Sequence, residues 1–412
     1  MRVNGRVIGA VVAALCVASA HAADPDASMF SFSGFGTLGV VHSSEDRADF
    51  VASYLKPNGA GHTHQWSPAV DSRIGAQATA DITPQLSAVL QVISEQRHNG
   101  SYTPTVEWAN VKYQLTPDFS ARAGRIVLPI FLYSDYRKVG YAIPWVRPPG
   151  EVYGLVPITS SDGVDASYRL HAGEYTNTLQ ATYGKRVERI PGGSTATGDD
   201  LTSVQSTAEF GAATVRITYL RTRFSFDALR PLFDAFRQFG PEGIAIADKY
   251  DADNKPFRFI GLGASYEPND WFASGEWGKI NTHAFTGEKT AWYVSGGYRF
   301  GNFTPYLTYA RQKVDSNTSD PGLTLTGLPP PQTAVATGLN AGLNAALIVS
   351  SSAQRTASVG GRWNFMKNVA LKVQYDLIRI DAGSNGNLTN VQPDFQPGGK
   401  VNVFSTTVDF VF

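Results

Sequence analysis

Histidines are the first residues to weigh for chemistry, because an imidazole can act as a general base or as a metal ligand. None of those beyond residue 22 stands in a recognisable catalytic motif with a serine or an aspartate. His62 and His64 could chelate a metal, but a catalytic zinc normally takes three protein ligands. The stretch Asp315–Asp320 lacks the full spacing of a calcium loop. The sequence therefore predicts no catalytic residue, no metal site and no cofactor. The six histidines are His42, His62, His64, His98, His171 and His283.

A second group of charged residues lies in the segment from Ile126 to Asp162. Its interior has three bases and two acids, an excess of one positive charge. Such a segment performs no bond chemistry, but inside a narrow passage it would enrich ions of opposite sign. Its aromatic residues are expected to pack it against a neighbouring surface. The charged residues are Asp135, Arg137, Lys138, Arg147 and Glu151.

The first 22 residues have the features of a secretory signal peptide. Arg2 and Arg6 precede an apolar run from Val7 to Ala20, and Ala20-His21-Ala22 offers the small-x-small cleavage pattern. The run is shorter than the roughly 18 residues that a membrane helix needs, which argues against the alternative of a retained anchor. We expect cleavage after Ala22, leaving residues 23–412 as one domain.

The composition after cleavage excludes several classes of protein. The single cysteine is lost with the signal, so disulfides and thiolate metal sites are excluded. Loss of two arginines leaves 33 of the 35 basic residues against 35 acidic ones, a formal charge of −2, which does not suggest a nucleic-acid partner. Charged residues are only 17% of the chain, against roughly 25% in soluble proteins. No later window reads as apolar enough for a membrane helix, so a membrane location would require a closed barrel.

The strongest pattern is an alternation of short and long connections between strand-like segments. The short ones are rich in Gly, Pro, Asn and Asp, as tight hairpins require. The long ones are polar. Short turns at one end and long loops at the other are typical of an outer-membrane barrel. Sixteen segments are predicted, beginning at Phe30, Ser72, Leu86, Val106, Phe119, Gly163, Tyr175, Leu201, Ala213, Phe257, Trp271, Thr290, Phe303, Arg355, Val369 and Val401.

The segments alternate between apolar and polar residues. In 369–377, for example, Val369, Leu371 and Val373 share one face, while Lys372 and Gln374 share the other. A soluble sandwich and a membrane barrel both produce this pattern. Aromatic residues gathered beside the short turns favour the barrel, because they suit a membrane interface. Only the segment Ser225–Phe239 has helical spacing, which predicts a short helix within a long loop.

The chain resembles the general trimeric porins of Gram-negative outer membranes, over about residues 30–412. The resemblance is carried by the opening Phe32-Ser33-Gly34-Phe35-Gly36-Thr37-Leu38-Gly39, by Ser72-Arg73-Ile74-Gly75, by Ala123-Gly124-Arg125, and by the terminal Phe412. It implies an all-β, 16-stranded antiparallel transmembrane barrel with short periplasmic turns, long extracellular loops and the third loop folded into the lumen. It also implies that Phe412 is the signal for the barrel-assembly machinery.

In that family, bases on the barrel wall face acids on loop three across a constriction. The resemblance assigns Arg73, Arg125 and Arg169 to the wall. Strict alternation from Phe119 would turn Arg125 outward unless Gly124 introduces a bulge. The family's acidic loop motif has no clean match, and the net charge of the loop and wall suggests a weak preference for anions.

The function implied is a porin: a water-filled channel for passive diffusion of small polar solutes and ions, without enzymatic activity. The resemblance also implies a homotrimer, in contact with outer-membrane lipid and lipopolysaccharide. Three alternatives remain open at this point: an adhesin or anchor acting through its long loops, a substrate-specific channel, and a soluble β protein.

Overall fold

The computed structural model describes residues 28–315 and 317–412. The predicted signal peptide and its cleavage site lie outside the described residues.

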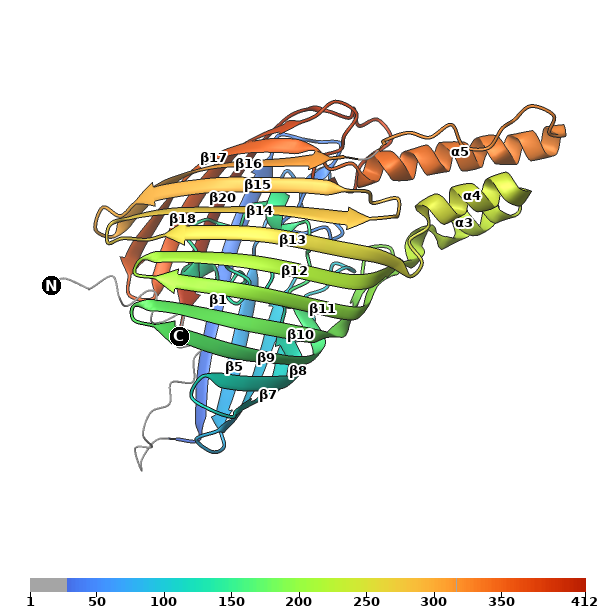
Figure 1. The fold of residues 1–412 in the computed structure, drawn as a ribbon. Coiled ribbons are helices and arrows are strands. Elements are labelled where there is room, and N and C mark those ends of the chain that lie inside the picture. The colour runs from blue at the N-terminus through green and yellow to red at the C-terminus, as the bar shows by residue number, and fades with distance from the viewer. Residues whose placement is uncertain (1–27, 316) are drawn as a thin grey trace.

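Sixteen long antiparallel strands close into one barrel (Figure 1), as the sequence predicted. Each pairs with its neighbour in the chain, and β1 pairs with β20 to close the ring. A two-residue strand, β4 (Trp66–Ser67), lies beside β1. The sixteen are β1 (Phe30–Ser43), β5 (Arg73–Asp81), β6 (Leu86–Glu95), β7 (Thr105–Gln114), β8 (Phe119–Val127), β9 (Ser160–Ala172), β10 (Tyr175–Arg189), β11 (Thr195–Phe210), β12 (Ala213–Phe226), β13 (Lys255–Tyr266), β14 (Trp271–Thr282), β15 (Lys289–Tyr298), β16 (Phe303–Val314), β17 (Gln354–Met366), β18 (Val369–Ile380) and β20 (Gly399–Val411).

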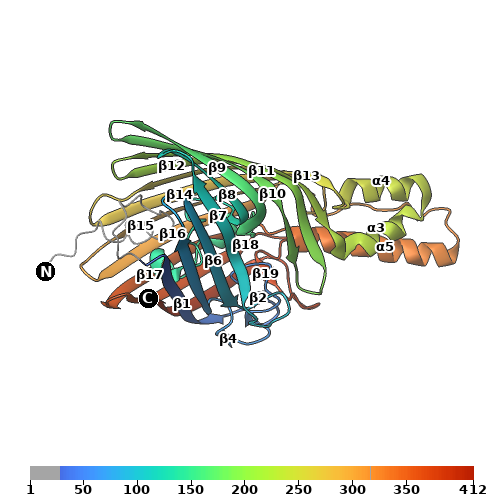
Figure 2. The same ribbon diagram turned by 90° about the horizontal axis from the view of Figure 1, so that it is seen from below.

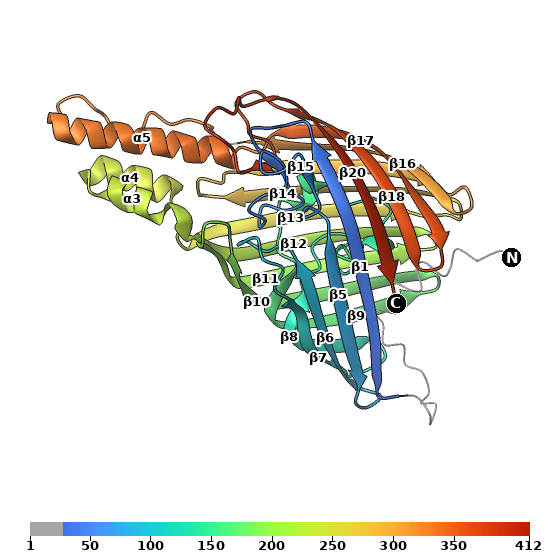
Figure 3. The ribbon, with the colours of Figure 1, turned by 180° about the vertical axis from the view of Figure 1, so that it is seen from behind.

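The two ends of the barrel differ in the length of the connections between strands. The tight turns gather at the end where the described chain begins and ends (Figures 1 and 3). Gly211 and Gly301 occupy two of these turns at φ of 57° and 59°, a conformation that costs glycine little. The long connections gather at the opposite end, called the loop end below.

The strands separate an apolar outside from a polar inside. In β18, Val373, Tyr375 and Leu377 are exposed, whereas Lys372, Gln374 and Asp376 on the alternate face are buried. Because a closed barrel can bury only its inward face, the exposed apolar rows must point outward. This is the arrangement expected for a barrel whose outer wall meets lipid.

The seam between β1 and β20 explains the glycines of the opening motif. A Cβ at Gly34 would lie 2.2 Å from the Phe412 ring, and one at Gly36 would lie 2.3 Å from the Phe410 ring. The two stacked rings therefore lie directly over bare backbone of β1. Gly34 and Phe412 also exchange backbone hydrogen bonds of 2.8 and 3.0 Å, so the terminal aromatic residue is built into the closure.

Two long loops form a helical projection beyond the loop end (Figures 1 and 2). The loop after β12 contains the 3-10 turn η2 (Asp227–Leu229), α3 (Arg230–Arg237) and α4 (Gly240–Tyr250), so the helix predicted near Ser225–Phe239 is confirmed. The loop after β16 contains α5 (Pro330–Ser350), a helix that was not predicted from the sequence. The three helices share one buried apolar cluster.

Helix α5 also corrects the expectation that no segment beyond the signal resembles a membrane helix. By length and composition its 21 residues are apolar enough to cross a membrane, although only 17% of its most apolar window is buried. The helix lies beside α3 and α4, outside the ring of strands (Figure 1).

A small second sheet lies at the loop end. It joins β2 (Asp49–Phe50) and β3 (Ala60–Gly61) of the first loop to β19 (Leu388–Thr389) of the last. Apolar residues of both loops pack there against the inward residues Val41, Ile378 and Val403. The first and last loops are thereby fixed beside the barrel seam.

Candidate functional site: the loop inside the barrel

Loop three, residues 128–159 between β8 and β9, lies inside the barrel. It contains the 3-10 turn η1 (Gly140–Ala142) and the single-turn helix α2 (Gly150–Tyr153). Its apolar side chains form one buried cluster with inward residues of β11 to β16. Trp145 is the largest of them, and its indole Nε1 donates a 2.8 Å hydrogen bond to Ser295 in β15. Aromatic packing therefore holds this side of the loop, as predicted.

Lys138 anchors the opposite side of loop three. Its Nζ donates to Glu95 at the end of β6 at 2.7 Å and to Glu107 in β7 at 2.9 Å. Burial alone would lower the pKa of Lys138, but the carboxylates of Glu107 and Glu95 outweigh it and the net shift is upward. Arg73, the predicted wall residue, has its Nε 3.9 Å from Glu95. Arg73 thus joins this cluster on the inward face of β5.

Arg147 makes the second charged anchor. Its Nε and a terminal nitrogen reach the two oxygens of Asp71 at 2.9 and 2.5 Å, a bidentate pair. The guanidinium also donates to Ser405 in β20 at 2.7 Å and lies 3.4 Å from Asp376 in β18. Burial lowers the pKa of Arg147, Asp71 opposes this, and the net shift is upward. Loop three is therefore tied to both sides of the seam at this point.

Lys372 of β18 and Asp409 of β20 form a third anchor, with both side chains fully buried and 3.0 Å apart. Lys372 Nζ also donates to the carbonyl oxygens of Gly140 at 2.6 Å and Trp145 at 2.8 Å. Thr37 donates to Asp409 at 2.5 Å across the seam. A Cβ at Gly140 would lie 2.1 Å from the Asp409 carboxylate, so only glycine allows this close approach.

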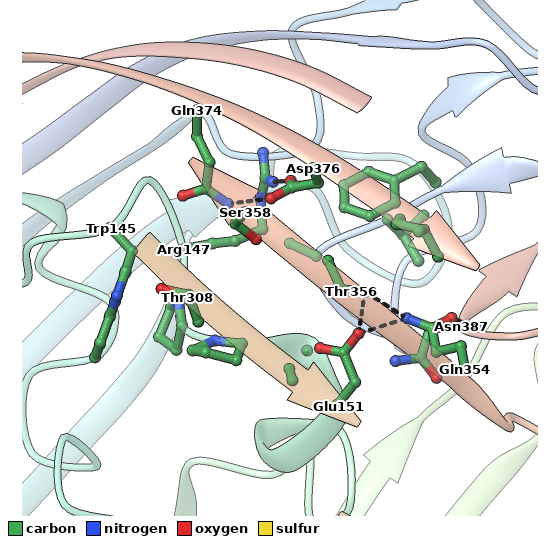
Figure 4. Close-up of a pocket in the computed structure, with 18 residues that line it drawn as sticks. Trp145, Arg147, Glu151, Thr308, Gln354, Thr356, Ser358, Gln374, Asp376 and Asn387 are labelled. Carbon is green, nitrogen blue, oxygen red and sulfur yellow. Dashed lines mark hydrogen bonds and ion pairs between the residues drawn. The ribbon is translucent and has the colours of Figure 1, made fainter. Parts of the chain in front are cut away.

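Glu151, in α2, meets neutral partners rather than bases. Gln354 of β17 donates to its carboxylate at 2.7 Å, and the Thr356 hydroxyl donates to the same oxygen. These residues border a cavity of about 60 Å³ between loop three, the first loop and β16 to β18 (Figure 4). Burial raises the pKa of the Glu151 carboxyl, and the two hydrogen bonds offset only part of that rise.

This raised pKa gives a pH-dependent prediction for Glu151→Gln. A raised folded-state pKa contributes stability that is complete below the unfolded value and is lost as pH rises through the folded value. Glutamine keeps an acceptor for both donors without the buried charge. We expect the variant to melt at a higher temperature than wild type at pH 7, with the difference shrinking toward pH 4. Glu209→Gln, at an exposed carboxylate, is the control, and a lower melting temperature at pH 7 would contradict the assignment.

The remaining charged residues of loop three have weaker or internal contacts. Asp135 lies 4.0 Å from Arg216 of β12, whose guanidinium also donates to the Phe131 carbonyl. Arg137 donates to the carbonyl oxygens of Pro157, at 3.3 Å, and Ile158, at 2.6 Å, which joins the two arms of the loop.

One wall acid that was not among the predicted site residues holds the loop through hydrogen bonds from neutral donors. Glu276 of β14 accepts hydrogen bonds from the Leu132 backbone at 2.8 Å, from Tyr153 at 2.6 Å and from Tyr293 at 3.0 Å. The alternation of β14 places Glu276 on the inward face, and this could have marked it as a candidate site residue. Its partners Leu132 and Tyr153, however, lie more than 120 residues away in the chain, so the contacts themselves could not be predicted from local sequence.

Most ion pairs between loop three and the rest of the barrel therefore join a base of the loop to an acid of the wall, which is the reverse of what the resemblance implied. The bases Lys138 and Arg147 belong to the loop, and the acids Glu95, Glu107 and Asp71 belong to the wall or the turn before it. Among the ion pairs of the described residues, the Asp135–Arg216 contact is the one between loop three and the wall that follows the expected direction. Most charge across this interface is neutralised in pairs.

Two of the three predicted wall arginines do not reach loop three. The pairing of β8 with β7 and β9 shows no register shift at Gly124, so strict alternation places Arg125 on the outward face. There it pairs with Asp162 at 2.7 Å. Arg169 is on the inward parity of β9, but it is exposed and lies three residues before the end of the strand, near the turns. The structure thus brings only Arg73 to loop three.

Part of the lumen wall is left uncovered by loop three. Several inward residues of β8 to β11 on this part are polar and half-exposed: Arg122, Ser167, Thr178, Gln180 and Thr207. Other polar residues of the same inward face, such as Thr182 and Gln205, are buried. Arg122 pairs with the buried Asp165 at 2.5 Å, and Gln180 donates to the same carboxylate at 2.7 Å. This polar face lies beside the packed loop.

Within residues 28–315 and 317–412, no three His, Cys, Asp or Glu side chains are grouped so that they could hold a metal ion.

Comparison with known proteins places the fold. No family model matches the chain, and no curated protein matches its sequence. The barrel is similar to Salmonella typhi OmpF in complex with daunomycin, with a TM-score of 0.55 and 12% identity over 93% of this chain and 97% of that one. It is also similar to the outer membrane channel DcaP of Acinetobacter baumannii, with a TM-score of 0.52 and 13% identity over 93% and 97%. OmpT, an outer-membrane protein of Vibrio cholerae, gives a TM-score of 0.51 and 11% identity over 94% and 99%. The chain thus has the sixteen-stranded barrel fold of these outer-membrane proteins.

Proposed function

We propose that this protein is an outer-membrane channel through which small polar solutes and ions diffuse passively. The observation that carries the proposal is the division of the lumen: loop three packs against one part of the wall, and the rest carries inward polar residues, several of them half-exposed. Polar walls lower the cost of moving a hydrated solute across a membrane, while the loop limits its size. The similarity to DcaP, which is an outer membrane channel, supports this function.

We also propose how the protein is exported and how its barrel is assembled. Residues 1–22 would be removed as a signal peptide, and Phe412, which seals the β1–β20 seam, would serve as the assembly signal. We further propose a homotrimer in contact with outer-membrane lipid, with each protomer forming its own channel. Cross-linking of the protein in native membranes should give a trimer, and a monomer alone would contradict this part.

Reconstitution in a planar bilayer tests the channel itself. Purified protein should produce stepwise increases in conductance, grouped in threes if it is trimeric. Insertion without conductance would favour the second candidate, an adhesin or anchor. That alternative draws support from the helical projection formed by α3, α4 and α5 beyond the loop end (Figure 2).

The ion preference we propose is weakly anionic. Because the loop–wall charges are largely paired, the bias must come from bases such as the exposed Arg169 near the turn end. Arg169→Glu should move the reversal potential in a salt gradient toward cation selectivity. Arg230→Glu, on α3 outside the barrel, is the matched control and should not. Cation selectivity in the wild-type channel would overturn the preference.

A further inference from the structure

Four basic residues form a continuous row on the outer surface of the barrel. Arg311 of β16 lies opposite Arg355 of β17, Arg355 lies opposite Arg379 of β18, and Arg379 lies opposite Lys400 of β20. Side chains directly opposite on adjacent strands have Cβ atoms about 5 Å apart. The four strands lie side by side next to the seam (Figure 3). We call these four residues the cation row.

The cation row faces outward, away from the lumen. On each strand the neighbouring residue of opposite parity is buried inside: Gln312, Thr356, Ile378 and Val401. The residues of the same parity further along the strands are exposed and largely apolar, among them Leu307, Val359 and Leu377. The row therefore continues the apolar outer wall at the loop end.

The height of the cation row matches the edge of a bilayer. Arg311 lies eight residues from the exposed Phe303, which is opposite the exposed Trp363 beside the turns. Eight residues span about 26 Å along a strand, or about 20 Å across the membrane at a tilt of about 40°. An apolar band of about 25 Å is typical of these barrels, so the row lies where lipid headgroups begin.

The charges of the cation row are not neutralised by the protein. Among the described residues, none of its members has an ion pair within 4.0 Å, although many other bases of this chain do. The Nε of Arg311 is shielded from solvent and has no hydrogen-bond partner in the described part of the chain. Like charges directly opposite on adjacent strands repel one another, so four in succession destabilise the barrel unless an anion lies among them.

We propose that the cation row binds the phosphate groups of an anionic lipid in the outer leaflet. Arginine donates two parallel hydrogen bonds to a phosphate, and a row of such residues can serve more than one phosphate at once. The apolar residues below the row would contact the acyl chains of the same lipid. The proposal rests on the barrel spanning the outer membrane, and it does not depend on the channel activity.

Binding of a diphosphorylated lipid A to the detergent-solubilised protein tests the proposal, with native mass spectrometry as the readout. Each base near an anionic surface contributes about a five-fold gain in affinity, so Arg355→Gln/Arg379→Gln should weaken binding about 25-fold. The control, Arg230→Gln/Lys367→Gln, removes two exposed charges from a loop helix and a turn and should bind as wild type does. Lipid A stripped of its phosphates should bind all variants equally weakly.

Two results would overturn the proposal. One is equal loss of lipid A binding in the control and in the row variant, which would show that net charge alone is responsible. The other is displacement of lipid A by an equal concentration of inorganic phosphate, which would identify a free-anion site. Conductance of the same preparations reports the channel separately, and it should be unchanged in the row variant because neither side chain faces the lumen.

Discussion

Arg147→Ala is expected to release loop three from the barrel seam and to destabilise the folded protein. The substitution leaves Asp71 buried without its bidentate partner and leaves Asp376 without the only base within 4.0 Å of it in the described chain. Removing one member of a buried ion pair typically costs about 3–5 kcal/mol, because the remaining charge is uncompensated. The free energy of unfolding, measured in urea with lipid-reconstituted protein, should fall by about that amount.

The same variant should change the channel. Arg147 joins the loop to β18, to β20 and to the turn before β5, so its loss frees the segment near Pro148 and Pro149. We expect higher single-channel conductance with larger current fluctuations than in wild type. Arg147→Lys should rescue this only in part, because an ammonium group cannot reproduce the two parallel hydrogen bonds to Asp71.

Arg47→Ala supplies the matched control for this experiment. Arg47 is also an arginine of a long loop, but it is half-exposed and pairs with the exposed Asp394. Exposed pairs contribute about 0–1 kcal/mol, so this variant should be nearly as stable as wild type. If Arg147→Ala is as mild as Arg47→Ala and leaves the conductance unchanged, loop three is not held as described.

The strand count was predictable from the sequence because turns and alternation are local features. Eight of the predicted strand starts, Phe119 and Val369 among them, coincide with the structure. The largest difference is at β11, which begins at Thr195 rather than Leu201. The first residues of β11, Thr195 to Asp200, are small or polar and lack the alternation of apolar and polar residues from which the strand was predicted.

Helix α5 was missed for a different physical reason. It carries no charged residue, and Ala, Gly and Asn give it only a weak contrast between faces. Its buried face is defined by contacts with the loop after β12, almost a hundred residues earlier in the sequence. The spacing of apolar residues within α5 therefore says little about which of its faces is buried.

The loop–wall contacts could be predicted only in outline. A long third loop with paired charges followed from the sequence, but Lys138 finds its partners 31 and 43 residues away, and Arg147 finds Asp376 229 residues away. Those pairings depend on how far each strand is shifted against the next. The orientation of Arg125 was equally hard to predict, although it depends on a neighbouring residue. A single bulge at Gly124 would have turned the Arg125 side chain into the lumen.

Lys372→Met is expected to have an effect as large as that of Arg147→Ala, because it removes the fully buried base that links loop three to the barrel seam. Asp409 would keep its hydrogen bond from Thr37 but lose its counter-ion, and two loop carbonyls would lose their donor. The expected loss is again about 3–5 kcal/mol in the free energy of unfolding. Lys367→Met, in an exposed turn, is the matched control and should stay within about 0.5 kcal/mol of wild type.

The double variant Lys372→Met/Asp409→Leu separates charge from packing. If the single variant is destabilised by the unpaired carboxylate, removing that carboxylate should restore part of the stability, because an apolar pair of similar volume can replace a buried ion pair. The rescue should be incomplete, since the carbonyls of Gly140 and Trp145 would still lack a donor and each such buried group costs about 1–3 kcal/mol. A double variant that loses as much as the sum of the two single variants would show that the two side chains contribute independently, and the coupling of loop three to the seam through this pair would then be wrong.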